Sequence, residues 1–175
     1  MKPPVIALLA FGIATPALAE WRLDNGVAIV APAATNSTME LLAISCGDPY
    51  LVEVYSRGGP VRPAEGDHPA KYFHIPGRIE ARIDGRTFPL VAAGSGAAAV
   101  LFFPGSEMQN GMASVSDDFI ETLKAGKNLS LVFDVTPERN EADGSAFETM
   151  AEFPLESSAA ALDTALAPCR HSASR

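Results

Sequence analysis

Cys46 and Cys169 are the two cysteines of this 175-residue chain, and their thiols are the side chains with the clearest chemistry. Neither lies in a CxxC motif or beside a cluster of histidines and cysteines, which argues against a redox-active or metal-binding pair. In an exported chain, two such cysteines are most simply one structural disulfide bond, and two unpaired thiols are the alternative. We predict the bond, which would join the start of the folded domain to its end.

Three histidines are the next candidates for chemistry. His68 lies in a long loop, His74 at the start of a strand and His171 near the C-terminus. A zinc site requires two or three closely placed His, Cys or carboxylate ligands, and Asp67, His68 and His74 are the set that could converge. Ordinary surface positions are the simpler interpretation, so we predict no metal site.

Two serines lie between or near glycines, but neither Ser95 nor Ser106 has a recognisable base partner. The chain contains no G-x-S-x-G and no H-E-x-x-H motif. The run GSGAAA at residues 94–99 resembles a dinucleotide-binding fingerprint, but a strand follows it where a phosphate cradle requires the start of a helix. We predict no catalytic residue and no cofactor; an enzyme whose catalytic groups come from distant residues is the alternative.

Residues 1–19 have the pattern of an export signal. A short positive start precedes an apolar core, VIALLAFGIA at residues 5–14, which is too short to span a bilayer. An A-x-A cleavage site ends at Ala19. A buried N-terminal helix is the alternative, and three prolines within the segment argue against it. We therefore predict a periplasmic or secreted protein whose mature chain begins at Glu20.

The mature chain is acidic. Removal of Lys2 with the signal leaves 12 basic against 21 acidic residues, a formal charge of -9. Nucleic acids and anionic membrane surfaces do not attract such a chain without a local basic patch, so we predict neither as a partner. The most apolar later stretch, AAAVLFFP, has only the length of a strand, and we predict no stable membrane insertion after signal cleavage.

Alternating apolar residues predict a mainly β domain over residues 20–169. Strands are expected over residues 26–30, 39–46, 50–55, 78–84, 86–92, 98–103, 129–135 and 146–153. Cys46 then lies at the tip of a hairpin. Trp21 is expected to pin the new N-terminus to the core, with a role as a binding anchor as the alternative.

The hairpin at residues 78–92 is the clearest local pattern. Apolar and charged residues alternate along its first strand, and Asp84-Gly85 is typical of a two-residue turn of the primed type. The charges alternate in sign, so we expect them to pair with one another across strands, with a recognition surface as the alternative.

Two helices are expected beside the strands. The first spans residues 116–125, with Ser116 as its cap, acidic residues in its first turn and Gly126 at its exit. The second follows Ser157 or Ser158 and carries Cys169 on its apolar face. Residues 170–175 are expected to form a disordered tail.

Residues 57–71 interrupt this pattern with glycines, prolines and charges and no periodicity. Such a long loop is either a tolerated insertion or a functional loop. If functional, it is the part of the chain that could insert into a secreted hydrolase as an inhibitor.

Several segments together resemble a family of small periplasmic proteins of proteobacteria. They are a tryptophan soon after the cleavage site, a strand ending in LxISC, a charged hairpin turning at an aspartate, a helix ending in LKAG and a C-terminal FPLxxSxxALxxxLxPC. The matching residues are Trp21, Leu42–Cys46, Arg78–Asp84, Leu123–Gly126, Phe153–Leu155 and Ala160–Cys169.

This pattern resembles accessory proteins of type VI secretion loci of the VasI type and, more distantly, invasion-associated locus B proteins. The chain departs from them in the insertion at 57–71 and in lacking a tryptophan after the charged hairpin. The resemblance implies an exported accessory protein and supplies no catalytic signature.

The sequence therefore predicts an antiparallel β-sandwich or curved sheet of seven to nine strands, with a short helix near 116–125 and a C-terminal helix tied by a disulfide bond. The expected function is non-catalytic binding of another exported or envelope protein. An inhibitor of a secreted hydrolase and an unrecognised hydrolase are the alternatives.

Overall fold

Antiparallel strands make up most of the molecule. The computed structural model describes residues 19–172 apart from 48, 58–72, 96–97 and 107–113. Its elements in chain order are β1 (Arg22–Asp24), β2 (Val27–Val30), β3 (Ala34–Thr35), β4 (Met39–Cys46), β5 (Tyr50–Ser56), β6 (Ile79–Ile83), β7 (Arg86–Ser95), β8 (Ala98–Phe102), α3 (Asp117–Ala125), β9 (Asn128–Arg139), β10 (Ala146–Pro154), α4 (Ser158–Ala165) and α5 (Ala167–Ser172).

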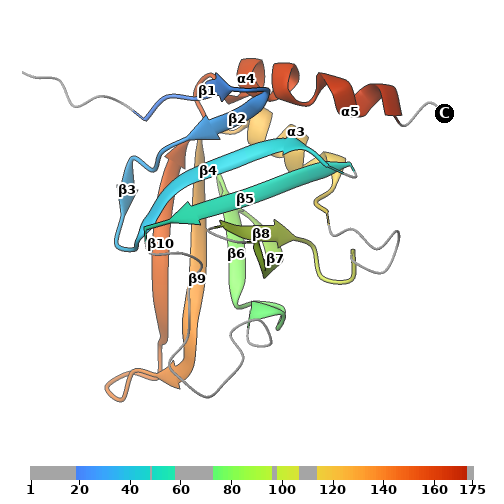
Figure 1. Ribbon diagram of the computed structural model, residues 1–175. Coiled ribbons are helices and arrows are strands. Elements are labelled where there is room, and N and C mark those ends of the chain that lie inside the picture. The colour runs from blue at the N-terminus through green and yellow to red at the C-terminus, as the bar shows by residue number, and fades with distance from the viewer. Residues whose placement is uncertain (1–18, 48, 58–72, 96–97, 107–113, 173–175) are drawn as a thin grey trace, which may run out of the picture.

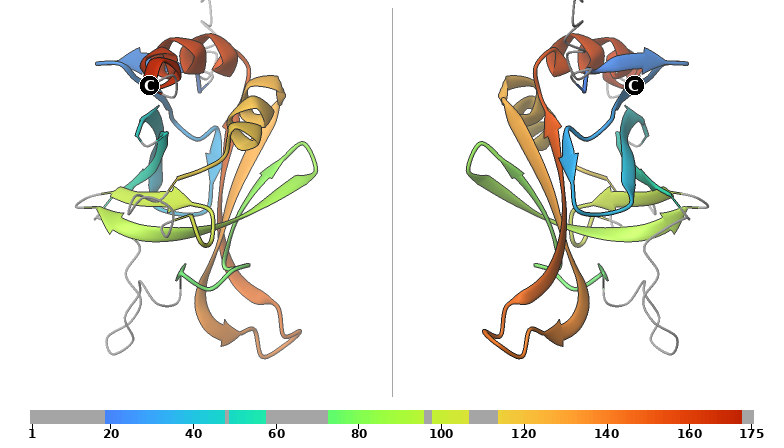
Figure 2. Two further views of the ribbon diagram at one scale, coloured as in Figure 1. Left: turned by 90° about the vertical axis from the view of Figure 1, so that its right-hand side faces the viewer. Right: turned by 90° about the vertical axis from the view of Figure 1, so that its left-hand side faces the viewer.

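The ten described strands form one strongly curved sheet in the order β1-β2-β4-β5-β8-β7-β6-β9-β10-β3. Strand β7 makes the curvature possible because its two halves have different neighbours. Residues 86–90 pair with β6, whereas residues 91–95 pair with β8. The sheet thus turns from one layer, β4-β5-β8, into a second layer, β6-β9-β10, as Figures 1 and 2 show. This confirms the prediction of a mainly antiparallel β fold with a curved sheet.

The core lies between these two layers and is closed at one end by helices. Apolar side chains alternate along the inner faces, and Ile44, Leu90, Leu101 and Leu131 are among those with 1% or less of their surface exposed. Helix α4 packs against α3, β1, β2 and β4 across this end (Figure 1). None of the helices in the described residues has the length and apolar character that crossing a bilayer requires.

Two short strands, β1 and β3, were not predicted, so the sheet exceeds the expected seven to nine strands. They have three and two residues, and all of these are exposed. Their sequences do not alternate between buried and exposed residues. Each forms a strand because it pairs with a neighbour: β1 pairs with β2, and β3 pairs with β10. Since β3 follows β2 closely, it brings the chain from one end of the sheet to the other.

The charged hairpin forms as predicted. Asp84 and Gly85 have φ angles of 45° and 90°, the positive values that a two-residue primed turn demands. The Asp84 carboxylate also accepts hydrogen bonds from the backbone N–H groups of Lys127 and Asn128, at 2.8 and 3.1 Å. The turn residue therefore fixes the hairpin to the start of β9, which its sequence pattern did not indicate.

Helix α3 begins as predicted, but Gly126 ends it for a different reason. The Ser116 hydroxyl accepts from the Phe119 N–H at 3.2 Å, which is the expected cap. Gly126 has a φ of -79°, so it is not the left-handed exit that usually selects glycine. A Cβ atom there would come within 2.8 Å of both Ile83 Cγ2 and Leu155 Cδ1. Close packing against β6 therefore requires glycine at this position.

Gly126→Ala is expected to lower the free energy of unfolding by about 1–3 kcal/mol, because the added methyl group overpacks this contact. Gly94→Ala is a matched control, since a Cβ at Gly94 has open space around it. Urea denaturation of both variants measures the difference. A Gly126→Ala protein as stable as Gly94→Ala would contradict the close approach.

The predicted C-terminal helix is two helices. Helix α4 ends at Ala165 and α5 begins at Ala167. Pro168 explains the break, because a proline in a continuous helix lacks the N–H and clashes with the carbonyl four residues earlier. The sequence placed the start of the disordered tail at residue 170, which is wrong for residues 170–172 because α5 continues to Ser172; the rest of that predicted tail lies outside the described residues.

The predicted serine caps of α4 are also corrected. Ser157 precedes the helix in a left-handed conformation, with φ at 65°, and its side chain makes no capping hydrogen bond. The buried Ser158 hydroxyl instead donates to the Leu123 carbonyl of α3 at 3.0 Å. This serine therefore joins two helices and leaves the first turn of α4 uncapped by either side chain.

Lys124 also links α3 to α4. Its side chain is 13% exposed, and Nζ lies 2.8 Å from carboxylate oxygens of both Asp163 and Glu121. Hydrogen bonds to Asp163 and then Glu121 raise the pKa of Lys124 above its ordinary 10.5. A raised pKa means that the contribution to stability is complete below the unfolded-state pKa and is lost as the pH rises through the higher folded-state value.

We therefore expect the stability difference between the unaltered protein and Lys124→Met to be constant up to about pH 9 and to shrink above pH 10.5, as the lysine of the unaltered protein loses its proton. Urea denaturation over this pH range measures it. A difference that stays constant into the alkaline range would show that the lysine acts through its aliphatic chain alone.

Candidate functional site

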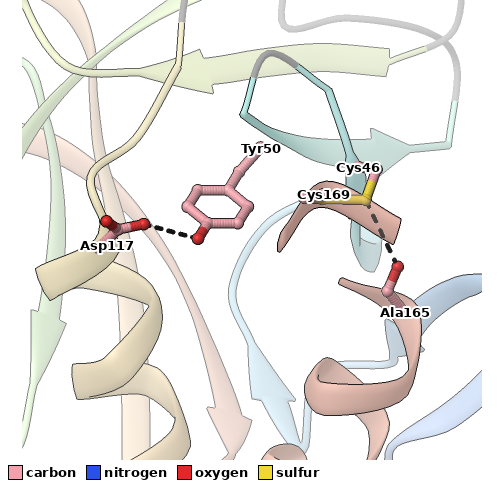
Figure 3. Close-up of a disulfide and its surroundings, with 5 residues drawn as sticks. All are labelled: Cys46, Tyr50, Asp117, Ala165 and Cys169. Carbon is pink, nitrogen blue, oxygen red and sulfur yellow. Dashed lines mark hydrogen bonds between the residues drawn. A yellow bond between two sulfur atoms is a disulfide. The ribbon is translucent and has the colours of Figure 1, made fainter. Parts of the chain in front are cut away.

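The two cysteines form the predicted disulfide bond. It joins the end of β4 to α5, with Cα atoms 5.5 Å apart and a sequence separation of 123. Figure 3 shows the bond beside two further contacts: the Tyr50 hydroxyl donates to Asp117 at 2.6 Å, and Cys46 Sγ lies 3.8 Å from the Ala165 carbonyl oxygen. These contacts therefore hold the tip of the β4–β5 hairpin, α3 and the C-terminal helices together at one end of the sheet. This is the role expected of a structural disulfide bond.

Of the three histidines, His74 is the one whose side chain belongs to the described part of the structure. His74 was predicted at the start of a strand, but it lies in a turn before β6. It is exposed, and its ring lies edge-on to Phe102 with centroids 5.7 Å apart. Asp67 and His68 lie outside the described residues, and His171 belongs to α5. Within the part of the chain that is described, no three His, Cys, Asp or Glu residues are placed to hold a metal ion.

The two serines belong to structural parts of the fold. Ser95 is the last residue of β7 and pairs with Ala98 of β8, so the glycine-rich run connects two strands, as predicted. The Ser106 Oγ accepts a hydrogen bond from the Ser114 N–H at 3.1 Å, which spans a loop. The hydrogen bond links the turn that follows β8 to the segment that precedes α3.

Trp21 holds the N-terminal segment, as predicted. Its side chain is 5% exposed, and Nε1 donates to the Pro154 carbonyl at 2.7 Å. Pro154 ends β10, so the tryptophan joins β1 to the far layer of the sheet. The alternative of an exposed binding anchor at this residue is wrong.

A buried carboxylate lies on the outer face of β9, where the sequence pattern did not indicate one. Asp134 alternates with the core residue Phe133, yet its own side chain is only 6% exposed. The guanidinium groups of Arg78 and Arg139 cover it as ion pairs, the latter at 3.0 Å. The Asp134 N–H also donates to the Arg78 carbonyl at 2.8 Å. These contacts hold β9 at the point where β6 begins.

The expected pairing of the hairpin charges is found in part. Arg82 lies 2.8 Å from Glu80 on its own strand and 3.7 Å from Glu148 on β10. Arg78 is engaged by Asp134. Beside these groups is a hollow of only about 40 Å³, lined by Gly77, Arg78, Glu80, Arg82, Val132, Asp134 and Glu148. It has room for little more than one water molecule.

A larger surface hollow of about 220 Å³ lies near β3 and is lined by Thr35, Ser37, Thr38, Met39, Glu40 and Arg57. Its polar groups bind one another: the Thr35 and Ser37 hydroxyls are 2.7 Å apart, and Arg57 Nε is 2.6 Å from Glu40. Thr35 Oγ1 also donates to the Met150 carbonyl at 2.9 Å. These bonds shape the connection between β3 and β4. Residues 57–71 form the loop that was named as the candidate inhibitory element. Of this loop, Arg57 is described, and residues 58–71 lie outside the described residues.

The feature that distinguishes the surface is the far end of the β9–β10 hairpin. Pairing of β6 with β9 covers only residues 129–133 of β9, and β3 pairs with β10 only at Ala151 and Glu152 among the described strands. Residues 134–148, here called the distal ribbon, therefore extend beyond both neighbours. Figures 1 and 2 show this hairpin projecting away from the helices.

The distal ribbon exposes apolar side chains and strand backbone together. Phe147 is 44% exposed, and the adjoining Met150 is 37% exposed. On the side of β10 away from β9, residues 146–149 have no described strand neighbour, and we call them the open edge. Exposed apolar residues beside an unpaired strand edge are features of protein-binding surfaces.

Sequence reasoning predicted β10 but not its open edge. The preceding strand was predicted to end at residue 135, whereas β9 continues to Arg139. The pairing is irregular between Ala146 and Glu148, where β9 has extra residues that include Pro137. Proline is tolerated in a strand at such a bulge. The alternation of apolar residues therefore stops before the strand itself ends.

The site is therefore a projecting antiparallel ribbon on a curved-sheet domain that is closed by helices and one disulfide bond. Comparison of the chain with models of protein families, with curated proteins and with solved structures finds no match.

Proposed function

We propose that the chain is an exported, non-catalytic binding module that acts in the periplasm through contacts with another exported or envelope protein. The observation that carries this proposal is the open edge of β10, next to the exposed Phe147 on the projecting distal ribbon. Such an edge offers backbone hydrogen bonds and apolar area to a partner.

The rest of the molecule supports a rigid carrier for this surface. The Cys46–Cys169 bond agrees with an oxidising compartment, which the signal pattern of residues 1–19 also predicts; residues 1–18 of that pattern lie outside the described range. The resemblance to VasI-type accessory proteins supports an association with a secretion system. We include that association in the proposal.

Site-specific photocross-linking in cells that produce the full chain tests the proposal. A photoreactive residue at Phe147 is expected to give a discrete protein adduct from the periplasmic fraction. Leu23 is the matched control position, because it is 45% exposed but lies on β1 at the opposite end of the sheet order. Equal adducts at both positions, or none at Phe147, would contradict a partner at the distal ribbon.

A further inference from the structure

The backbone of the open edge is directed away from the sheet. The Met150 N–H donates to Asn36 Oδ1 at 2.6 Å and its carbonyl accepts from the Asn36 N–H at 3.2 Å, so both groups face away from β9. Backbone groups alternate in direction along an antiparallel strand, so those of Glu148 point the same way. At Glu148, however, β3 has already ended. This residue therefore presents a donor and an acceptor where another strand would bind.

The charge around this edge is negative. Glu138, Glu141, Asp143 and Glu148 are all exposed on the distal ribbon. The ion pairs found among the described residues include none with Glu138, Glu141 or Asp143, whereas Glu148 lies 3.7 Å from Arg82 and Arg139 is committed to Asp134.

Asp143 remains charged over a wide pH range. Hydrogen bonds from the side chain and then the backbone of Ser145 lower the pKa of Asp143 below its ordinary value. The Asp143 carboxylate at the tip of the distal ribbon therefore keeps its negative charge to a lower pH than an ordinary aspartate does.

We propose that the open edge of β10 takes up an extended, basic segment of the partner protein as an added strand. This inference rests on the proposed function and names the chemistry of its partner. Charge complementarity selects the occupant: lysine or arginine side chains at alternate positions would face Glu148 and the acidic tip. A second copy of this chain would bring like charges together, which opposes strand pairing between two distal ribbons.

The two faces of the added strand differ. By the two-residue period, Glu148 and Met150 face outward, whereas Phe147 and Thr149 continue the face of the buried Ala151. The segment therefore carries basic residues on one face and an apolar side chain that covers Phe147 on the other. Backbone hydrogen bonds hold the segment, and the alternating side chains select it.

Synthetic octapeptides test this directly against the oxidised protein purified from the periplasm. The first probe alternates lysine and valine. The second replaces every lysine with glutamate, and the third alternates lysine and proline, which keeps the charge but cannot form a strand. Titration monitored by amide chemical shifts is expected to show binding of the first probe alone, with the largest shifts at residues 146–149.

Variants of Glu148 then separate the contribution of backbone hydrogen bonds to peptide binding from the contribution of charge. Glu148→Gln is expected to weaken binding of the lysine–valine peptide about three- to fivefold, as loss of one exposed charge pair would. Glu148→Pro, which also removes the outward N–H, is expected to weaken it at least tenfold. Glu152→Gln is the matched control, because Glu152 is exposed on the same face but its edge is occupied by β3. Its affinity is expected to change less than twofold.

Equal binding of the lysine–valine and lysine–proline probes would overturn the added strand, because charge alone would then explain the affinity. No binding, or shifts confined to another edge, would also overturn it. Self-association of the protein through residues 146–149 would identify a second copy as the occupant and contradict the proposal. A discrete adduct at Phe147 together with failed peptide binding would leave the binding function standing and refute only the basic strand.

Discussion

Replacing Cys169 with serine is expected to lower the free energy of unfolding by about 2–5 kcal/mol, and the melting temperature by roughly 5–15 °C. The bond closes a loop with a sequence separation of 123 residues, so its removal gives the unfolded chain much more conformational freedom. The loss is large because the bond joins the β4–β5 hairpin to the helices that close the core.

Thermal and urea denaturation of Cys169→Ser and of the double variant Cys46→Ser/Cys169→Ser measure this effect. The two variants should agree, since either one removes the same bond, and the unaltered protein under reducing conditions should match them. Non-reducing mass spectrometry should find one intramolecular bond in the periplasmic protein. Two free thiols, or unchanged melting of Cys169→Ser, would show that the helices dock without the bond.

Asp134→Ala is expected to lower the free energy of unfolding by about 3 kcal/mol, which is the second large effect. The change removes a buried carboxylate and leaves the guanidinium groups of Arg78 and Arg139 without their shared counter-charge. These arginine side chains are 26% and 37% exposed, so water can recover part of the loss, which keeps the estimate at the lower end for a buried pair.

Urea denaturation of Asp134→Ala against Glu148→Gln tests this role. Glu148 pairs with Asp134 across the hairpin, but its side chain is 45% exposed, so Glu148→Gln is expected to change stability by less than about 1 kcal/mol. Amide exchange in the distal ribbon should accelerate in Asp134→Ala. Equal stability of the two variants would mean that the arginines anchor the ribbon without the buried carboxylate.

Local patterns predicted those parts of the fold that local physics determines. Asp84-Gly85 specified its own turn because only certain residues adopt positive φ cheaply. Ser116 specified the start of α3 in the same way. The disulfide bond followed from two cysteines and a signal pattern, without any knowledge of the strands that place them.

The parts that were missed depend on neighbours distant in the chain. Strand β3 has two exposed residues and exists only because β10 lies beside it. The role of Asp134 requires the register that places Arg78 against β9, and no spacing in the sequence carries that information. The open edge of β10 is likewise a property of where β3 stops, so no residue within β10 predicts it.

The histidines and serines that the sequence suggested as candidates do not form the proposed binding surface. His74 and Ser106 have residue types that can do chemistry, but the described contacts are a ring contact with Phe102 and a loop hydrogen bond from Ser114. The binding surface that we propose is instead built from backbone, Phe147 and carboxylates. Such surfaces leave no motif because their recognition depends on an unpaired edge.

The most direct test of this account is amide hydrogen exchange of the distal ribbon in the presence and absence of the partner recovered through Phe147. The Glu148 amide is expected to exchange rapidly in the free protein and to become strongly protected in the complex. Exchange at Leu23 on β1 should be unchanged, as this strand lies at the opposite end of the sheet order. Protection that is confined to β1, or a Glu148 amide as unprotected in the complex as in the free protein, would contradict binding at the open edge of β10.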